Sequence, residues 1–466
     1  MVLHPDRFLP SDPAVRGIAR RLLGEVESLP IVSPHGHTNP RWFADDAPFE
    51  SAVATFLWPD HYLLRMLYSQ GISLGRLGIA DRDGGPVERD HRKIWRLFGE
   101  QYYLFRGAPS HQWLDHVFGE VFGIPGRLSA ATADEFFDAI ADSLKRAEFR
   151  PRALFKRFNI EILATTESAL DPLVHHAKIA REWDGRVITT FRPDDVVDPE
   201  FSGFADNIDK LGVLTGEDVS EWKGYLAAIR ARREVFRAHG AVATDHGHPT
   251  AATADISLAD AEVLYAKVRR GAATPAEAEL FRAQMLTELA QMSLDDGMVM
   301  QIHPGSFRNH NPALYAKYDR DRGADIPVRT EYTRALHPML SRLGNEPGLT
   351  IILFTLDESN YARELAPLAG HYPCLRLGPP WWFHDSPEGI RRFREQTTET
   401  AGFYNCAGFN DDTRAFFSIP ARHDLARRSD CAYLAELVAT HRLEEDEAAE
   451  LAVDLAYRLA KAAYRL

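Results

Sequence analysis

The chain is 466 residues long, with 45% hydrophobic and 26% charged residues, which is typical of a folded globular protein and excludes disordered and fibrous classes. Its formal net charge of −13 at pH 7 disfavours a protein that binds the phosphate backbone of nucleic acids. Three widely spaced cysteines without a C-x-x-C pair favour neither a disulfide framework nor a zinc knuckle. With no export signal and no long apolar run, the sequence predicts a cytoplasmic protein with neither membrane nor nucleic-acid partners.

Short apolar, β-branched runs that end in polar clusters occur eight times along the chain. Segments with helical periodicity lie between most of them, and strands that alternate with helices indicate parallel βα units. The predicted strands are Leu29–Ser33, Ile160–Thr165, Arg186–Thr190, Ala241–Thr244, Met298–His303, Leu349–Leu356, Cys374–Gly378 and Tyr404–Gly408. Eight such units predict an α/β fold, a closed (β/α)8 TIM-type barrel that forms a single domain over residues 1–466.

Residues 45–151 contain amphipathic patterns such as Ala133–Ala147 but no convincing strand, so we expect a helical insertion after the first strand. Two helix starts are expected between the fourth and fifth strands. Ser257 precedes Asp260 at capping-box spacing, and Thr274 is followed by a proline and by Glu277.

Polar side chains follow most of the predicted strands, which is where a (β/α)8 barrel carries its chemistry. They include histidines, aspartates and arginines from segments far apart in the chain: His35, His37, Arg192, Asp245, His303, Arg308, Asp412 and Arg414. Trp381 and Trp382 follow the seventh strand and could pack at the rim or form a flat wall against a substrate. The sequence therefore predicts a site at one end of the barrel.

His35 and His37 are two residues apart, so an extended chain would place both rings on one face, where they could bind one metal ion. The pattern alone is weak, since a second H-x-H occurs at His246 and His248. His303 could be either a core histidine or a ligand, and turn chemistry alone could account for Asp412. Strand-end position favours the metal interpretation for all four predicted ligands: His35, His37, His303 and Asp412.

Arg192, Arg308 and Arg414 follow three different strands. A guanidinium group binds a carboxylate through two parallel hydrogen bonds, whereas the plain alternative for each arginine is a surface ion pair. Three arginines around one barrel mouth in an acidic protein would form a local anion site. We therefore expect an anionic substrate.

The order of these motifs resembles the uronate isomerase (glucuronate isomerase) family of the amidohydrolase superfamily. The resemblance extends from Arg7-Phe8 to the C-terminal region. It is carried by His35-Gly-His37, Asp60-His-Tyr62, Thr190-Phe-Arg-Pro-Asp194, Thr244-Asp-His-Gly247, Ile302-His-Pro-Gly-Ser-Phe-Arg308, Trp381-Trp-Phe383, Asp411-Asp-Thr-Arg414 and Arg422-His423.

The resemblance implies a barrel with a helical insertion that converts D-glucuronate to D-fructuronate and D-galacturonate to D-tagaturonate. It implies metal ligands at His35, His37, His303 and Asp412. It implies substrate-binding and proton-handling residues at His61, Tyr62, Arg192, Asp245, Arg308, Trp381 and Arg414. Members of the superfamily with two metals usually carry a lysine where this chain has Asp245, so one divalent ion and no organic cofactor are expected; Zn²⁺, Mn²⁺ and Fe²⁺ all suit the donors.

An aldose–ketose isomerisation needs a base for the C2 proton and a route for a hydrogen between two oxygens. Asp412 and Tyr62 are both candidates for the base, and Tyr62 or His61 for the oxygen shuttle, while the arginines would hold the C6 carboxylate. A hydrolase that acts on an acidic lactone or amide is the main alternative, because a superfamily barrel does not fix the reaction. A sugar-acid binding protein without turnover is a further alternative. The sequence is compatible with a homo-oligomer as well as with a monomer.

Overall fold

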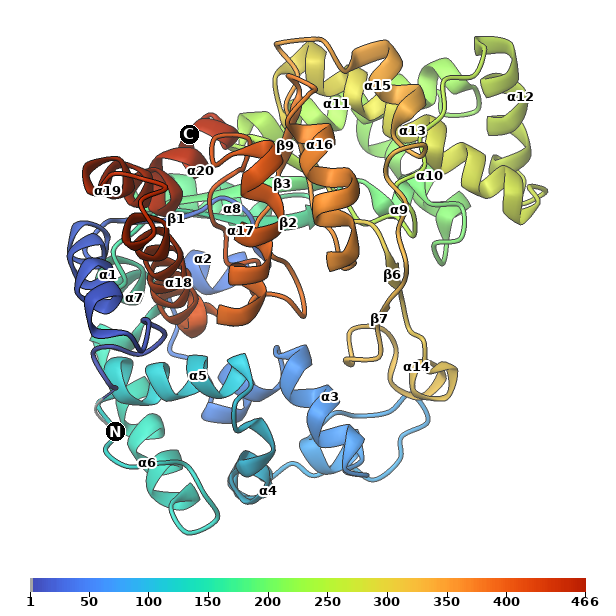
Figure 1. Cartoon of the computed structure of the whole chain (residues 1–466). Helices are drawn as coiled ribbons and strands as arrows, with labels where there is room; N and C mark the ends of the chain where they lie inside the picture. The colour runs from blue at the N-terminus through green and yellow to red at the C-terminus, as the bar shows by residue number, and fades with distance from the viewer. Residues whose placement is uncertain (1–2) are drawn as a thin grey trace.

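The centre of the computed structural model, which describes residues 3–466, is a parallel sheet of seven strands. Its strands are β1 (Ile31–Ser33), β2 (Ile160–Ser168), β3 (Arg186–Arg192), β4 (Ala243–His246), β5 (Val299–Ile302), β8 (Ile351–Leu353) and β9 (Leu375–Leu377). Their order in the sheet follows the chain, every pairing is parallel, and helices connect successive strands. The sheet curls between layers of helices, as expected for the predicted (β/α)8 TIM-type barrel (Figure 1).

The eighth position of the barrel is where the prediction was wrong in detail. The predicted strand Tyr404–Gly408 forms only one bridge, in which Cys406 pairs in parallel with Leu377. Gly408 has a φ of +70°, a left-handed conformation that an extended strand cannot continue through, and the side chain of Tyr404 is exposed. Beyond this bridge the amide of His37 donates to the carbonyl of Thr413 at 3.0 Å, which links the last segment to the end of β1.

Two further differences concern strand bounds and an additional hairpin. β2 extends beyond its predicted end to Ser168, and β8 covers only the middle of the predicted run. The short antiparallel hairpin of β6 (Ser306–Phe307) and β7 (Ile326–Pro327) was not predicted, because two-residue strands carry too little periodicity to be seen in a sequence.

The segment between β1 and β2 contains helices and no strand among the described residues. They are α2 (Pro40–Asp45), α3 (His61–Ser69), α4 (His91–Gln101), α5 (Pro109–His116), α6 (Ala133–Leu144) and α7 (Pro151–Arg157), with short 3₁₀ or π turns at Val53–Leu57, Leu74–Leu77, Tyr102–Phe105, Val117–Val121 and Ala147–Phe149. In Figure 1, α3 to α6 form a blue-to-cyan group beside the barrel. The boundaries of a separate insertion at residues 45–151 stay a prediction.

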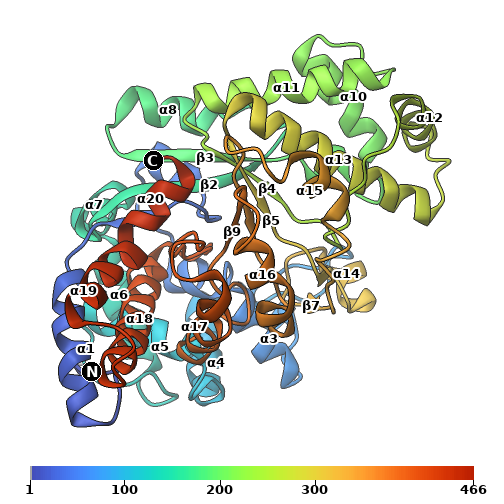
Figure 2. The ribbon, with the colours of Figure 1, turned by 45° about the horizontal axis from the view of Figure 1, so that its top comes forward.

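The remaining helices surround the strands (Figure 2). They are α1 (Pro13–Val26), α8 (Val174–Glu182), α9 (Asp194–Val197), α10 (Phe204–Thr215), α11 (Trp222–Ala238), α12 (Leu258–Arg269), α13 (Pro275–Asp296), α14 (Pro312–Tyr318), α15 (His337–Leu343), α16 (Ala366–Ala369), α17 (Pro387–Ala401), α18 (Ile419–Ala439), α19 (Glu445–Val453) and α20 (Leu459–Tyr464). Short turns occupy Glu358–Asn360, Tyr361–Leu365, Phe416–Ser418 and Asp454–Arg458.

The predicted helix starts lie where the sequence indicated. Thr274 caps α13 in a complete capping box with Glu277. The side chain of Ser257 accepts a hydrogen bond from the amide of Asp260 and so begins α12.

The C-terminal helix α20 packs against the N-terminal ends of the strands. Arg465 donates to the carbonyls of Gly297 and Gly348, which precede β5 and β8, at 2.8 and 2.7 Å. Tyr464 is fully buried, and its hydroxyl donates to the side-chain carbonyl of Gln301 at 2.7 Å. The amide nitrogen of Gln301 lies 3.3 Å from Nδ1 of His35, so the floor of the barrel connects to the end of β1.

No helix within residues 3–466 is both long and apolar enough to cross a membrane.

Candidate active site

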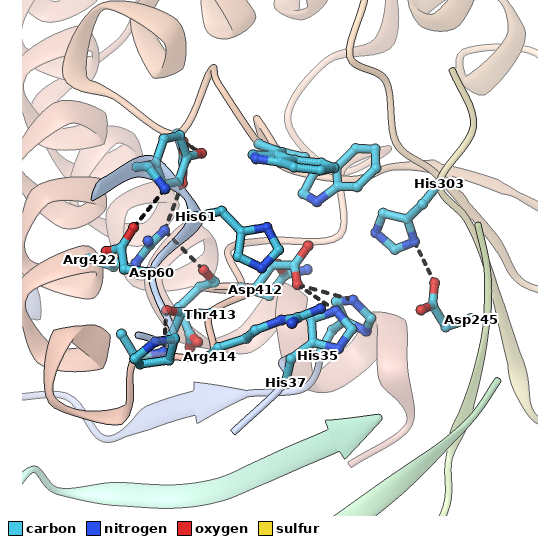
Figure 3. Close-up of a pocket in the computed structure, with 18 of the residues that line it drawn as sticks. His35, His37, Asp60, His61, Asp245, His303, Asp412, Thr413, Arg414 and Arg422 are labelled. Atoms are coloured by element: carbon cyan, nitrogen blue, oxygen red, sulfur yellow. Dashed lines mark hydrogen bonds and ion pairs between the residues drawn. The ribbon is translucent and has the colours of Figure 1, made fainter. Parts of the chain in front are cut away.

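One pocket at the C-terminal ends of the strands gathers every residue for which the sequence predicted a chemical role (Figure 3). These residues are His35, His37, His61, Tyr62, Arg192, Asp245, His303, Arg308, Trp381, Asp412 and Arg414. They come from the ends of β1, β3, β4, β5, β6 and β9, from the last barrel segment and from the N-terminus of α3. Barrel geometry explains the convergence, since parallel strands bring their carboxyl ends to the same rim.

His35 and His37 follow β1 and meet Asp412 from the last barrel segment. Their Nε2 atoms lie 3.4 and 3.2 Å from the same oxygen of Asp412, Oδ1. The chain is closely packed at Gly36, where a Cβ would lie in van der Waals contact, 3.4 Å from the carbonyl oxygen of Ala164. Burial alone would raise the pKa of Asp412, but the two histidines hold it well below its usual range.

Asp412 also has a strained backbone, with a φ of +37°. Aspartate tolerates this left-handed region better than most residues, and such conformations are frequent at functional sites. The carboxylate of Asp412 points to the two histidines, which both approach its Oδ1 (Figure 3).

His303 and Asp245 form a second, overlapping group with His35. Nδ1 of His303 lies 2.7 Å from Oδ1 of Asp245, and the other oxygen of Asp245 lies 2.9 Å from Nη1 of Arg192. The rings of His35 and His303 stack with centroids 4.9 Å apart. Burial favours protonated Asp245, but Arg192 and His303 hold its pKa well below the usual range.

The donor atoms fit a divalent metal ion. One ligand atom from each of His35, His37 and Asp412 lies within 4.8 Å of the other two, and the same holds for His35, Asp245 and His303. Nε2 of His303 and Oδ1 of Asp412 are buried without a hydrogen-bond partner among the described residues. Imidazole and carboxylate donors at this spacing suit a transition-metal ion, so the pocket has the donors to hold one.

The N-terminus of α3 places two further predicted residues in the pocket. Asp60 caps the helix, and its carboxylate accepts from the amides of Tyr62 and Leu63 at 2.8 and 3.2 Å. Burial and the nearby Arg414 lower the pKa of His61 to about 3, so the imidazole is neutral at neutral pH.

Asp385 is a pocket residue that the sequence reasoning missed. It accepts from the hydroxyl of Tyr62 at 2.7 Å and from Nη1 of the buried Arg422 at 2.6 Å. Burial and Asp385 together raise the pKa of Tyr62 well above its usual range, so the phenol stays protonated. Asp385 follows β9 by eight residues, and extending the search for polar residues farther into that loop would have found it.

The three predicted arginines all line the pocket, but each already has a carboxylate partner. Arg192 is held between Asp245 and Asp194, whose Oδ2 lies 2.8 Å from its Nε. The other two sit nearer the solvent: Arg308 pairs with Asp325 at 3.0 Å, and Arg414 with Asp321 at 3.4 Å, and their side chains are 38% and 39% exposed.

The aromatic residues after β9 form one wall of the pocket. The ring of Trp381 lies 4.6 Å from that of His303, and Trp382 faces both His61 and the guanidinium of Arg308. Trp381 therefore contacts the predicted ligand His303, which is consistent with either a packing role or a substrate wall.

The fold and the site together define an enzyme of the (β/α)8 barrel type whose pocket has donors for a metal ion and suits a small anionic molecule. Comparison with known proteins gives the particular family. The model of the glucuronate isomerase family matches residues 7–464, and the chain belongs to this family.

Relatives and solved structures agree. A uronate isomerase of Rhizorhabdus wittichii is 68% identical over 465 residues, which cover 100% of this chain and 98% of the relative. The crystal structure of glucuronate isomerase from Caulobacter crescentus is 60% identical, with a TM-score of 0.98, and covers 99% of this chain and 97% of its own. A uronate isomerase structure from Thermotoga maritima is 27% identical, with a TM-score of 0.92 and full coverage of both chains. The family and fold class predicted from the motifs are confirmed.

Proposed function

We propose that this chain interconverts D-glucuronate and D-fructuronate, and D-galacturonate and D-tagaturonate, by moving a proton between C1 and C2. The observation that carries the proposal is one pocket in which a histidine-flanked carboxylate, a neutral histidine and two rim arginines meet. Family membership over the whole chain supports the same reaction. An aldose–ketose isomerisation needs a base, a group that moves a hydrogen between oxygens, and a clamp for the substrate.

Asp412 is the residue we assign as the base. Both histidines face Oδ1, which leaves the second carboxylate oxygen for the C2 proton. The depressed pKa keeps this group ionised at neutral pH. Asp412 takes the proton from C2 to give an enediol-type intermediate and returns it to C1, so the same carboxylate serves in both half-reactions.

Tyr62 is less suited to be the base, because its hydroxyl proton is held by Asp385 and its pKa is raised. We assign the oxygen shuttle to His61, whose neutral ring offers one donor and one acceptor. His61 gives a proton to O1 while it accepts the proton of the C2 hydroxyl, which leaves the ring neutral at the end. Tyr62 then holds the pocket wall through Phe383, whose amide donates to the phenol oxygen at 2.8 Å.

Arg308 and Arg414 are the groups we assign to the C6 carboxylate, because they lie toward the solvent side of the pocket. A bidentate contact at that end would fix C1 and C2 at the far end of the sugar acid. Arg192 sits deeper, between Asp245 and Asp194, and we assign it to orienting Asp245.

A single divalent ion held by His35, His37 and Asp412, with His303 as a ligand or near neighbour, would polarise the carbonyl and hold the adjacent hydroxyl. The His and Asp donor set favours Zn²⁺ and also accepts Mn²⁺ or Fe²⁺. The three cysteines are buried and unpaired, which fits the proposed reducing cytoplasm.

The test is NMR of purified protein with D-glucuronate and D-galacturonate in D₂O, alongside a panel of acidic lactones and amides. We expect the two ketoses to form and the lactones and amides to remain intact. Product formation must be followed as well as exchange at C2, because intramolecular transfer can hide exchange. Cleavage of a lactone or amide without any ketose would support the hydrolase alternative, and binding without turnover would support a sugar-acid binding protein; either result contradicts the proposal.

A further inference from the structure

A second cluster of metal-ligating side chains lies on the opposite face of β4 from the pocket. Successive side chains of a strand point to opposite faces, so Asp245 faces the pocket and His246 faces away from it. His246, His248 and Asp194 form this cluster, with one ligand atom from each lying within 4.8 Å of the others. His246 and His248 are 0% and 3% exposed, so both rings are buried.

The hydrogen bonds of these histidines leave nitrogen atoms without a partner. Nε2 of His246 lies 2.9 Å from the hydroxyl of Thr244, whereas its Nδ1 has no partner within residues 3–466. His248 has none for either ring nitrogen in the same part of the chain. Buried polar atoms are nearly always hydrogen-bonded or bound to an ion, so three unpartnered nitrogens in one cluster point to a ligand.

The third member of the cluster is a carboxylate held in place by its neighbours. Asp194 accepts from the amide of Gly247 with both oxygens at 3.2 Å, and from Nε of Arg192 at 2.8 Å. Gly247 separates the two histidines, and a Cβ at this position would lie 2.1 Å from Nη2 of Arg192. A larger residue at this position would displace the Arg192 guanidinium, so glycine lets the H-G-H segment approach the Arg192–Asp194 pair this closely.

The charge around the cluster is mixed. Arg192 is paired with Asp194, and Arg282 of α13 is neutralised by Asp198 at 2.6 Å and by Glu200 at 2.8 Å. Each histidine keeps at least one ring nitrogen without a partner among residues 3–466, which leaves that nitrogen available to a ligand. Neutral imidazole and ionised carboxylate are the forms that bind a metal ion.

We propose that Asp194, His246 and His248 bind a second divalent transition-metal ion, of the Zn²⁺ class, at a site separate from the catalytic pocket. The hydroxyl of Thr244 holds Nε2 of His246, which turns Nδ1 to the ion. Two imidazoles and one carboxylate leave a fourth tetrahedral position for water. The ion ties the end of β3 to the end of β4 and thereby supports Arg192 and Asp245, which these two strands carry into the pocket.

The first test is a zinc-edge anomalous difference map from crystals of the wild-type protein, produced in zinc-supplemented medium. A peak among Asp194, His246 and His248, in addition to any peak beside Asp412, is the expected result. This measurement needs no variant. No peak in this cluster, with the pocket peak present, would overturn the proposal, since water would then satisfy the histidine nitrogens.

The second test is the zinc content of variants. We expect two ions per wild-type chain, one ion in His35→Gln/His37→Gln, and one ion in His246→Gln/His248→Gln. The control His371→Gln changes an exposed histidine and should keep both ions. A His246→Gln/His248→Gln protein with wild-type zinc content would refute the second site.

A thermal-shift measurement then separates binding from a merely structural role of the two rings. Added Zn²⁺ should raise the Tm of His35→Gln/His37→Gln, in which the pocket is disabled, and the further change His248→Gln should abolish that rise. A zinc-dependent rise that survives His248→Gln would contradict the assignment. Loss of isomerase activity in His35→Gln/His37→Gln affects neither readout, so the second site is tested independently of the reaction.

Discussion

Replacing Asp245 by asparagine tests whether this carboxylate orients the metal-site histidine and Arg192 together. The Asp245 side chain is 1% exposed; its Oδ1 is hydrogen-bonded to Nδ1 of His303 at 2.7 Å, and its Oδ2 forms an ion pair with Nη1 of Arg192 at 2.9 Å. An asparagine has the same shape but offers only one acceptor oxygen. Whichever way the amide turns, its NH₂ group meets a donor, so one of the two contacts must be lost.

The expected loss of activity and metal affinity in Asp245→Asn follows from the contact that the substitution removes. A hydrogen bond to a charged group is worth about 1.5–3 kcal/mol, and 1.4 kcal/mol corresponds to a tenfold effect. The loss of a carboxylate behind a metal-binding histidine typically lowers metal affinity or activity about 10- to 100-fold. We therefore expect kcat/KM for D-glucuronate to fall about 10- to 100-fold in Asp245→Asn, with weaker retention of the metal at limiting free Zn²⁺.

The assay is steady-state kinetics with metal analysis on the same samples. Asp430→Asn is a matched control, because Asp430 is also buried and binds Arg394 through two contacts of 2.7 and 3.0 Å, but it does not line the pocket. The control should lower the Tm and leave the metal content and the kcat/KM of the folded enzyme unchanged. If Asp245→Asn kept both metal content and kcat/KM within about twofold of wild type, the orienting role would be refuted.

Arg414→Met should lower kcat/KM for uronates about 10- to 100-fold with the metal content intact, since a charged hydrogen bond to the substrate is lost, and full retained activity would contradict the clamp. His61→Gln should lower kcat about 10²- to 10⁴-fold without loss of metal, and a smaller effect on kcat than on KM would exclude the shuttle role. Removal of the metal by a chelator should abolish turnover, and added Zn²⁺ or Mn²⁺ should restore it; activity in metal-free protein would argue against a catalytic ion. Burial raises the pKa of Glu167 from about 4.5 to about 7. Below pH 4.5 the carboxyl is neutral in both the folded and the unfolded state and costs no stability; above pH 7 it is ionised in both, and the buried charge lowers the free energy of unfolding by its full amount. The free energy of unfolding of Glu167→Gln should therefore exceed that of the wild type by up to about 3 kcal/mol at pH 8 and by little at pH 4.5. Denaturant unfolding at both pH values checks this.

The sequence predicted the positions of the barrel strands better than their lengths. Strand cores such as Val299–Ile302 are buried and, apart from Gln301, apolar, so their composition alone indicates a strand. The last strand failed because Gly402 and Gly408 adopt positive φ on either side of it, and a glycine in a sequence does not report which conformation it takes.

The candidate site was predictable where side chains lie at or just beyond a strand end, as His35, Asp245 and His303 do. The pairings were not predictable, because they join residues far apart in the chain. Tyr62 and Asp385 are 323 residues apart, and only the folded barrel brings the phenol to the carboxylate. The same contact changed the interpretation of Tyr62 from a candidate base to a group whose proton is held elsewhere.

The buried hydroxyl of Tyr464 has a consequence for the order in which the protein matures on the ribosome. His35 is synthesised early. Its partner Asp412 is made much later, and so is Tyr464, which binds Gln301, the residue next to His35. A nascent chain that has not reached Tyr464 lacks the hydrogen bond that its hydroxyl donates to Gln301, whose side-chain amide lies 3.3 Å from Nδ1 of His35. The three side chains His35, His37 and Asp412 can therefore meet only after nearly nine-tenths of the chain has been synthesised.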